Sequence, residues 1–599
     1  MSISTLDWSI IIAFFLLSLL IGLLVSKRAG SSSSEYFLSG RSMPWWLLGI
    51  SMVATTFSAD TPNLVTDIVR KNGVAGNWAW WAFLLTGMLT VFIYARLWRR
   101  SGVFTDLEFY ELRYSGKTAA FLRGFRALYL GFFFNVMIMA TVCLAAIKIG
   151  GVLLGIDPIP LMLAASLITV VYSALGGLRG VIITDFFQFI IAMVGAIGAA
   201  VVVLQLPQVD GLQGLLQHEA VRQKLNLIPD PSDLDVFIPI FLIPLAVQWW
   251  SVWYPGAEPG GGGYIAQRML AAKDERHATG ATLLFNIMHY AVRPWPWILV
   301  ALASLIVFPD HEALRQAFPH VQEGIIADDL AYPAMLTFLP KGLMGIALAS
   351  LIAAFMSTIS THLNWGSSYI VHDWYQRFVR PDASERELVL AGRISTVLLM
   401  LFAAVFALWL ESAFKAFNIL LQIGAGTGLI FILRWFWWRV NAYSELSGMI
   451  VSFLVAVYLE LIHERLGLPP LAPWVKLLTG VGITTAGWLL VTWLTRPTRY
   501  ETLLAFYRKV RPASAGWTPL LKEALERGDL SPADINPGRL PLQIACMLTG
   551  TIMVYAALFG TGFVIYGHLW QAVAAFAVAA LSAAWLIRAW HRLGLEAAN

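Results

Sequence analysis

A short run of small and hydroxyl-bearing residues, 353–361, lies inside a segment long enough to span a membrane. In a helix, Ala354, Ser357 and Thr358 fall at positions i, i+3 and i+4, so they share one face. That face would present a backbone carbonyl and two hydroxyl oxygens at a depth without water. A bare hard cation needs several oxygen ligands, so a second element must supply the rest. The alternative is that these residues only let two membrane helices pack closely.

The composition is that of a polytopic membrane protein. Of the 599 residues, 58% are hydrophobic and 13% are charged, and the mean hydropathy is +0.69. The chain reaches the roughly 20-residue apolar length of a membrane helix about fifteen times. The predicted spans are 7–26, 44–66, 74–97, 122–150, 158–175, 178–205, 236–256, 278–307, 341–371, 388–411, 414–436, 446–464, 473–495, 541–566 and 569–590. The first is too long, and its flank too poor in basic residues, for a cleavable signal peptide, so we expect it to remain as a helix.

The sequence does not indicate an enzyme or a nucleic-acid-binding protein. It contains no catalytic triad, no phosphate-binding glycine loop and no nucleic-acid-binding module. Its two cysteines, Cys143 and Cys546, lie in apolar spans, so we expect neither a disulfide nor a metal site there. No segment points to an obligate protein partner.

Positive charge predicts the orientation in a cell (inner) membrane, because cytoplasmic loops carry an excess of Lys and Arg. With the N-terminus outside, most of the 41 basic residues fall on the cytoplasmic side, and the C-terminus is cytoplasmic. The longest polar stretch, 496–540, then lies along the inner surface. It is too small for an enzymatic domain, and we expect short helices in it, for example over 519–527.

Two spans carry residues that a regular helix avoids. Span 44–66 holds Asp60 and Pro62, and a proline disfavours helix at the preceding residue, so we expect the chain to unwind around 57–61. Span 236–256 leads into a Pro- and Gly-rich stretch, 255–263. The interruptions lie five spans apart, which indicates two five-helix halves in opposite orientation. The alternative is a chance pair of kinks, although many transporters hold coupling ions at broken helices.

Five motifs in order resemble those of the sodium:solute symporter family, which includes bacterial sodium/galactose and sodium/proline transporters and animal sodium/glucose relatives. They are 37–41, 172–188 (YSALGGLRGVIITDFFQ), 267–273, 357–364 and 373–375. The resemblance implies an all-α LeuT-type fold of two inverted five-helix repeats with extra helices at both ends. We accordingly divide the chain into an extra N-terminal helix (1–35), a first repeat (36–205), an inverted second repeat (206–440), two further helices (441–495), a cytoplasmic linker (496–540) and two C-terminal helices (541–599).

The resemblance also implies a main sodium site. By similarity, the carbonyl oxygens of Ala54 and Phe57 on the first broken helix would face the carbonyl of Ala354 and the hydroxyls of Ser357 and Thr358. Five oxygens without a full charge suit Na⁺, while use of H⁺ or Li⁺ stays open.

A second ion position in some relatives matches Asp185, Ser360 and Thr361. Because all three residues bear oxygen, coupling to two ions is open. Asp185 is equally consistent with a gate or with a structural acid.

The resemblance is weaker for the solute. In sugar-transporting relatives, the positions matching Asp60 and Thr61 lie near the solute, a tyrosine matching Tyr264 gates the site, and a basic residue matches His289. Arg293 lies one turn beyond His289 on the same helical face. A pairing of Asp60 with either base is open, and so is a packing role for His289.

The expected function is sodium-coupled symport of a small polar solute by alternating access, with Na⁺, the solute and the lipid bilayer as partners. We favour a sugar or polyol. A monocarboxylate or an amino acid is the alternative if Arg293 and His289 face the solute. A transporter-derived sensor and an uncoupled facilitator are further alternatives. Segment 255–263 looks inserted relative to the sugar-transporting relatives, and it places Gly261 where an amide is expected.

Overall fold

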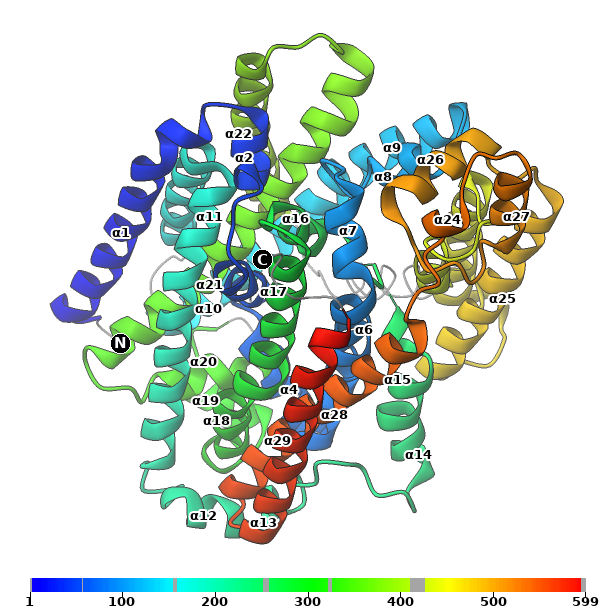
Figure 1. Cartoon of the computed structure of the whole chain (residues 1–599). Coiled ribbons are helices and arrows are strands. Elements are labelled where there is room, and N and C mark those ends of the chain that lie inside the picture. Colours follow the sequence, from blue (N-terminus) through cyan, green and yellow to red (C-terminus); the bar gives the residue numbers. More distant parts are fainter. Residues whose placement is uncertain are drawn as a thin grey trace.

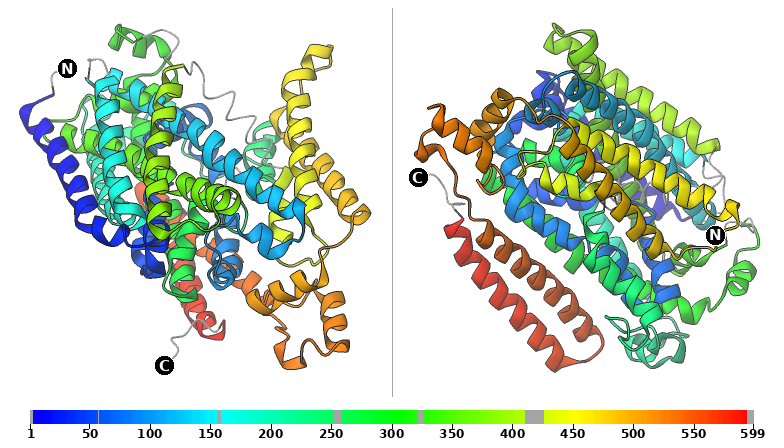
Figure 2. Two further views of the ribbon diagram at one scale, coloured as in Figure 1. Left: turned by 90° about the horizontal axis from the view of Figure 1, so that it is seen from above. Right: turned by 90° about the vertical axis from the view of Figure 1, so that its right-hand side faces the viewer.

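The computed structural model describes residues 3–56, 58–154, 159–251, 258–321, 326–409 and 426–593. Over these residues the regular elements are helices and no strand is present (Figure 1); an isolated parallel bridge pairs Met43 with Ala272. Helix α1 (Thr5–Ala29) and the pair α24 (Ala442–Val457) and α25 (Pro473–Leu494) lie at opposite ends of the molecule in Figures 1 and 2.

The part of the chain that the structure describes contains eleven helices long and apolar enough to cross a bilayer. They are Thr5–Ala29, Val74–Ser101, Lys117–Ile147, Met162–Leu204, Glu275–Val307, Leu343–Val379, Glu385–Leu408, Ala442–Ile462, Pro473–Leu494, Leu540–Ile565 and Leu569–Arg592. Two shorter apolar helices, Trp45–Thr55 and Leu234–Ala246, fall in the two spans predicted to be broken. Most of the predicted span 414–436 lies outside the described residues, so the full number of spans stays a prediction.

Helix α11 (Ile159–Leu204) contains two of the predicted spans. Gly177 interrupts it with a φ of 52°, and a Cβ at this glycine would lie 2.6 Å from the carbonyl oxygen of Tyr36. Tyr172 before the break and Asp185 after it both hydrogen-bond to adjacent residues of α21 (Leu343–Ser368), at 3.2 and 2.7 Å. A straight helix would separate these two residues by about 20 Å. We infer that α11 doubles back at Gly177 and that both arms lie against α21.

The first broken helix consists of α3 (Trp45–Thr55) and α4 (Thr61–Asn72). Pro62 lies in the first turn of α4, where a backbone N–H has no partner within the helix in any case. The hydroxyl oxygen of Thr61 accepts a hydrogen bond from the backbone N–H of Ser58 at 3.1 Å, which satisfies a donor in the break. The interruption predicted around 57–61 is confirmed over the described residues on both sides of Phe57.

The second broken helix consists of α14 (Leu234–Phe237), α15 (Ile243–Ala246) and α16 (Gly263–Ala271). Gly260, Gly261 and Gly263 have φ values of 86°, 93° and 52°, which only glycine adopts readily. The indole N–H of Trp98 donates to the carbonyl of Gly260 at 2.9 Å and holds the glycine run against the neighbouring helix.

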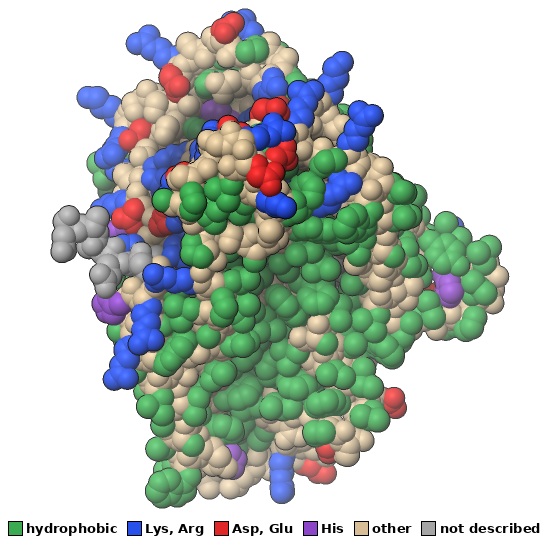
Figure 3. Space-filling view, turned by 45° about the vertical axis from the view of Figure 1, so that its right-hand side comes forward, with side chains coloured by type: hydrophobic (Ala, Val, Ile, Leu, Met, Phe, Trp, Pro, Cys, Tyr) green, Lys and Arg blue, Asp and Glu red, His purple; other side chains and the backbone are tan. Residues whose placement is uncertain are grey.

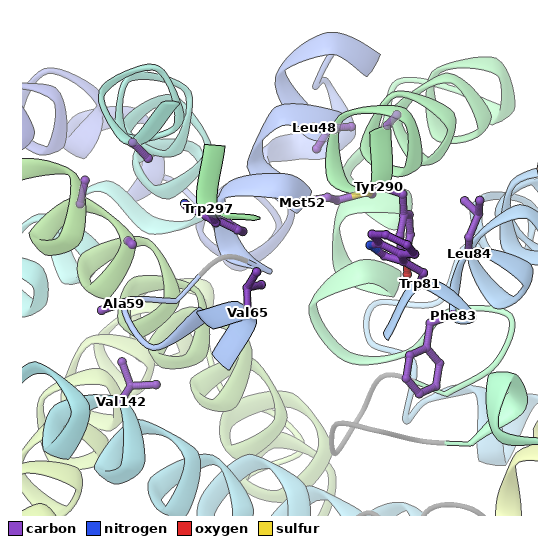
Figure 4. Close-up of a cluster of buried hydrophobic side chains, with 14 of the residues drawn as sticks. Leu48, Met52, Ala59, Val65, Trp81, Phe83, Leu84, Val142, Tyr290 and Trp297 are labelled. Atoms are coloured by element: carbon purple, nitrogen blue, oxygen red, sulfur yellow. The ribbon is translucent and has the colours of Figure 1, made fainter. Parts of the chain in front are cut away.

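The broken helices pack against continuous ones around a shared apolar core. These are α6 (Leu84–Leu89), η3 (Thr90–Tyr94) and α7 (Ala95–Ser101); α9 (Lys117–Leu128) and α10 (Asn135–Leu154); α17 (Glu275–Ile287), η7 (Met288–Val292) and α18 (Pro294–Val307); and α22 (Glu385–Trp409). In Figure 4, Leu48 and Met52 of α3 and Val65 of α4 point into this core.

The C-terminal helices α28 (Leu540–Ile565) and α29 (Leu569–Arg592) are attached to the helices that hold the candidate site. The hydroxyl of Tyr555 donates to the carbonyl of Trp81 at 2.8 Å, and Gln543 donates to the carbonyl of Phe92 at 3.0 Å. The polar stretch before them contains α26 (Tyr500–Val510) and α27 (Thr518–Glu526), so the short helices predicted there are confirmed.

Candidate functional site

Helices α3 and α21 meet where the first broken helix unwinds. The hydroxyl of Thr358 donates to the carbonyl of Thr55 at 3.3 Å, so α21 contacts the last turn of α3. Ala54, Ala354 and Ser357 are all buried beside this contact. Four of the five predicted sodium ligands therefore lie on two facing helices, and the fifth, Phe57, lies outside the described residues.

The hydroxyl of Ser357 points toward an acid. It donates to Asp185 Oδ1 at 2.7 Å, while the hydroxyl of Ser360 donates to the carbonyl of Ser357 at 3.0 Å. A hydroxyl that gives its proton to a carboxylate keeps its lone pairs for a cation. Asp185 therefore orients a predicted ligand from behind, as the outer partners of metal ligands do.

Asp185 has a cation beside it that sequence reasoning did not select. Its Oδ2 lies 3.6 Å from Arg268 Nη2 and accepts a hydrogen bond from Ser51 at 2.5 Å. The same guanidinium donates to Thr361 Oγ1 at 2.6 Å and, through Nε, to Ser51 at 3.2 Å. Arg268 and Asp185 are both fully buried. The signal for Arg268 was its place in the 267–273 motif.

Arg268 lies at the predicted second ion position. The three residues Asp185, Ser360 and Thr361 do lie in one region, but Arg268 stands between Asp185 and Thr361. Ser360 directs its hydroxyl to the carbonyl of Ser357. We call these groups, with Ser51 and Ser357, the ion-side network.

A second polar region surrounds a cavity between the two broken helices. Its walls come from the first break, from α6 and η3, from the segment before α16, and from α17 and η7. We call it the polar cavity. Its residues are Thr56, Phe83, Thr86, Gly87, Thr90, Glu258, Gly261, Gly262, Tyr264, Ile265, Thr282, Phe285, Asn286, His289 and Tyr290. Sequence reasoning selected Tyr264 and His289 from this set and missed the threonines and Asn286.

Several polar atoms around the cavity have no hydrogen-bond partner among the described residues. Asn286 donates through Nδ2 to the carbonyl of Thr282 at 2.8 Å, but its buried Oδ1 accepts nothing from the described residues. His289 Nδ1 is likewise buried without a hydrogen-bond partner in the described chain. Buried polar atoms are almost always paired, and exceptions call for an explanation. His289 also lies in a π-helical stretch, a geometry frequent at functional sites.

Tyr264 closes one side of the polar cavity. Its hydroxyl lies 2.8 Å from Thr56 Oγ1, and Thr56 donates its own proton to the carbonyl of Met52 at 2.7 Å. Tyr264 is therefore the donor to Thr56. This bond joins α16 to the last turn of α3.

Three predicted solute contacts do not line the polar cavity. Asp60 is exposed beside the first break, and Thr61 uses its hydroxyl oxygen within that break. Arg293 donates to the carbonyl of Val53 at 3.5 Å and lies over the ring of Trp297 at 5.0 Å. Among the described residues no ion pair joins Asp60 to Arg293 or His289. Of the two readings that the sequence left open, the structure does not show the pairing of Asp60, because Arg293 is directed to the end of α3.

Comparisons with known proteins identify the family of this chain. The sodium:solute symporter family profile matches residues 36–452. A sodium/glucose cotransporter of Vibrio parahaemolyticus is 25% identical over 458 residues, which cover 74% of this chain and 82% of the relative. A sodium/myo-inositol cotransporter 2 of Oryctolagus cuniculus is 27% identical over 503 residues, covering 78% and 71%.

A solved structure with a similar fold is a substrate-bound, outward-open Na⁺-coupled sialic acid symporter. The TM-score is 0.65 at 20% identity, and the alignment covers 83% of this chain and 99% of the other. This likeness supports the predicted LeuT-type arrangement of the helices. From the matched profile and the fold, we conclude that this chain is a multi-pass membrane transporter, not an enzyme, and belongs to the sodium:solute symporter family.

Proposed function

We propose that the chain imports a neutral, polyhydroxylated solute, a sugar or polyol, together with Na⁺ by alternating access. The observation that supports this most is the polar cavity, with its unpaired buried acceptor on Asn286, beside the ion-side network. Sites for small ligands combine apolar walls with a few polar groups that fix the ligand's orientation. The named activities of the relatives, sodium/glucose and sodium/myo-inositol cotransport, support the same solute class.

For the coupling ion we propose a site formed by the carbonyls of Ala54, Phe57 and Ala354 and the hydroxyls of Ser357 and Thr358. The facing of α3 and α21 supports it. Because the oxygens carry no full charge, the ion can leave without abandoning a buried carboxylate. Na⁺ acts here as a co-transported substrate.

At the second ion position, formed by Asp185, Ser360 and Thr361, we propose that Arg268 supplies the positive charge. A second Na⁺ would have to share one carboxylate with a guanidinium 3.6 Å away, which like-charge repulsion opposes. We therefore propose one Na⁺ per solute. A Hill coefficient clearly above one for Na⁺ in uptake would contradict this.

The alternative solute, a monocarboxylate or amino acid, needs a cation at the cavity wall. In that alternative Arg293 and His289 face the solute and Asp60 does not, whereas Asp60, Thr61 and Tyr264 belong to the sugar or polyol reading. Arg293→Gln separates the two readings. A carboxylate ligand would lose a bidentate, charge-assisted contact and most of its binding, whereas a sugar or polyol should lose affinity only modestly.

For the orientation, we propose an N-terminus outside the cell membrane and a cytoplasmic C-terminus. In Figure 3, hydrophobic side chains form a broad belt, and most Lys and Arg side chains gather at the upper end, where α26 lies in Figure 1. An excess of positive charge on the cytoplasmic side supports this placement.

Ion binding is tested by the melting temperature of the detergent-solubilised protein. Na⁺ should stabilise it by on the order of 1 to 3 kcal/mol where K⁺ or choline at equal ionic strength does not. The double variant Ser357→Ala, Thr358→Ala should lose that difference. An unchanged Na⁺-specific melting shift in the double variant would refute the proposed ion ligands.

Solute class is tested by uptake into proteoliposomes with and without a Na⁺ gradient. The panel contains D-glucose, D-galactose, myo-inositol, L-proline and lactate. Sodium-driven uptake of at least one neutral polyol or sugar is expected. Sodium-driven uptake of lactate or proline alone would replace the solute class proposed here.

A further inference from the structure

The inserted Pro- and Gly-rich segment brings a carboxylate to the polar cavity. We propose that Glu258 is a solute-binding residue whose Oε2 accepts hydrogen bonds from hydroxyl groups of the solute. This inference rests on the proposed function and specifies how that site recognises its ligand. Glu258 is 3% exposed, yet it is one of the residues that line the cavity.

An arginine holds one oxygen of Glu258 and leaves the other without a partner. Arg126 of α9 forms an ion pair with Oε1, and its guanidinium lies 5.4 Å from the ring of Tyr110 and 5.2 Å from that of Phe431. Oε2 is buried and receives no hydrogen bond from the described residues. An acceptor in this state is costly unless a ligand satisfies it.

A second buried glutamate serves as a comparison. Glu445 Oε2 also receives no hydrogen bond from the described residues, but it lies 3.7 Å from Arg434 Nη1. Its Oε1 accepts a hydrogen bond from the hydroxyl of Tyr114 at 2.6 Å. Glu445 is not among the residues that line the cavity, whereas Glu258 is. An unpaired carboxylate oxygen therefore points to a solute only where it also borders the cavity.

The glycines that follow Glu258 leave space in the cavity and allow the backbone to pack closely against a neighbouring helix. Gly261 and Gly262 line the cavity and contribute no side chain. A Cβ on Gly260 would lie 2.8 Å from the ring of Tyr94. The backbone carries Glu258 close to its neighbouring helix because glycine permits this approach.

The acceptor character of the cavity defines the ligand. An ionised carboxylate only accepts hydrogen bonds, and Asn286 Oδ1 is a second acceptor. These two acceptors need a donor on the ligand, which hydroxyl groups provide and carboxylates do not. The rings of Phe83 and Tyr290 offer apolar faces to a sugar or cyclitol ring.

The test compares Glu258→Gln with the matched control Glu445→Gln in proteoliposomes. Both remove one buried charge beside an arginine, but only Glu258 lines the cavity. For the sugar or polyol that the wild type transports best, Glu258→Gln should raise the KM about ten- to hundredfold, the range expected for a charge-assisted hydrogen bond. Glu445→Gln should change the KM by no more than about twofold. The Na⁺-specific melting shift should persist in both variants.

Deoxy and deoxyfluoro analogues of the same solute locate the hydroxyl concerned. The analogue that lacks the hydroxyl bound by Glu258 should bind the wild type more weakly than the parent solute does. In Glu258→Gln the same analogue should bind about as well as the parent solute, because that hydrogen bond is already absent. Each of the other analogues should lose the same affinity in both proteins. A merely structural glutamate would weaken all analogues alike. If Glu258→Gln does not fold, Glu258→Asp, which keeps the charge on a shorter side chain, is measured with the same analogues.

An unchanged KM in Glu258→Gln, or additive losses for every analogue, would overturn the assignment of Glu258 while leaving the proposed function intact. A wild type that takes up no sugar or polyol, despite a normal Na⁺-specific melting shift, would instead refute the solute class. The two failures are therefore distinguishable.

Discussion

The ion-side network and the polar cavity both border the first broken helix, but their polar groups differ in whether they have hydrogen-bond partners. In the network, Asp185 and Arg268 are fully buried, and Asp185 is bonded by Ser51 and Ser357. In the cavity, Asn286 Oδ1 and His289 Nδ1 remain without hydrogen-bond partners in the described chain.

The difference indicates that the polar groups of the network stabilise the fold, whereas those of the cavity are available to a ligand. A saturated buried network contributes to a unique fold, and it is costly to break. Unpaired buried groups reduce stability, and they persist where a ligand or a moving proton uses them. We therefore expect substitutions in the network to act mainly on folding and coupling, and substitutions in the cavity to act mainly on solute affinity.

The largest expected effect is on the network. Arg268→Gln leaves Asp185 buried without its cation, which should cost about 3 to 5 kcal/mol of stability. Thermal unfolding in detergent measures the loss. Adding Asp185→Asn should recover most of it, because neither charge then remains unpaired. A double variant no more stable than Arg268→Gln would contradict the pairing.

Overpacking the cavity should have the next largest effect. A Cβ on Gly87 would overlap Asn286 Oδ1, so Gly87→Ala should cost about 1 to 3 kcal/mol and weaken solute uptake. The Na⁺-specific melting shift should survive. Gly480→Ala in α25, where nothing lies within 4 Å of the added Cβ, is the control and should leave uptake unchanged. If Gly87→Ala and Gly480→Ala changed stability and uptake equally, the contact with Asn286 Oδ1 would not explain the effect.

Removing an unpaired polar group should affect stability and function differently. His289→Phe keeps a ring beside Trp80 and Tyr290, now 5.6 and 4.5 Å from the imidazole, while it removes the partnerless Nδ1 and the 3.4 Å contact of Nε2 with Arg293 Nη2. We expect a loss of stability of about 1 to 2 kcal/mol, because Arg293 loses one acceptor, while solute uptake falls severely. Normal uptake would show that His289 serves packing.

A pair at the edge of the protein gives the smallest effect. Asp328 accepts a hydrogen bond from Arg70 Nε at 2.8 Å. Partial burial raises the pKa of Asp328, but the hydrogen bond and charge of Arg70 outweigh it, so the net pKa is lowered. The pair's contribution is therefore present above the usual carboxyl pKa and is lost as pH falls through the lowered one. Asp328→Asn should cost about 1 kcal/mol at pH 7 and leave solute KM unchanged, as measured by melting and uptake.

Local features were readable from the sequence. Pro62 disfavours helix at the residue before it, and α3 and α4 are indeed separate there. The Gly-Gly turn separates two spans because Gly177 adopts a left-handed φ. The spacing of Ala354, Ser357 and Thr358 placed three oxygens on one face, since helical periodicity depends only on near neighbours.

The pairings across the bundle were decided only by the tertiary structure. Arg268 meets Asp185, and Arg126 meets Glu258, over separations of about a hundred residues. Periodicity tells which residues share a face, but not which helix lies opposite or how it is rotated. For the same reason the sequence left a pairing of Asp60 with Arg293 or His289 open, whereas packing directs Arg293 toward the carbonyl of Val53 and leaves Asp60 exposed. The sequence alone therefore determined the broken helices and the helical face that carries Ala354, Ser357 and Thr358, and the packing of distant helices determined which charged groups are paired.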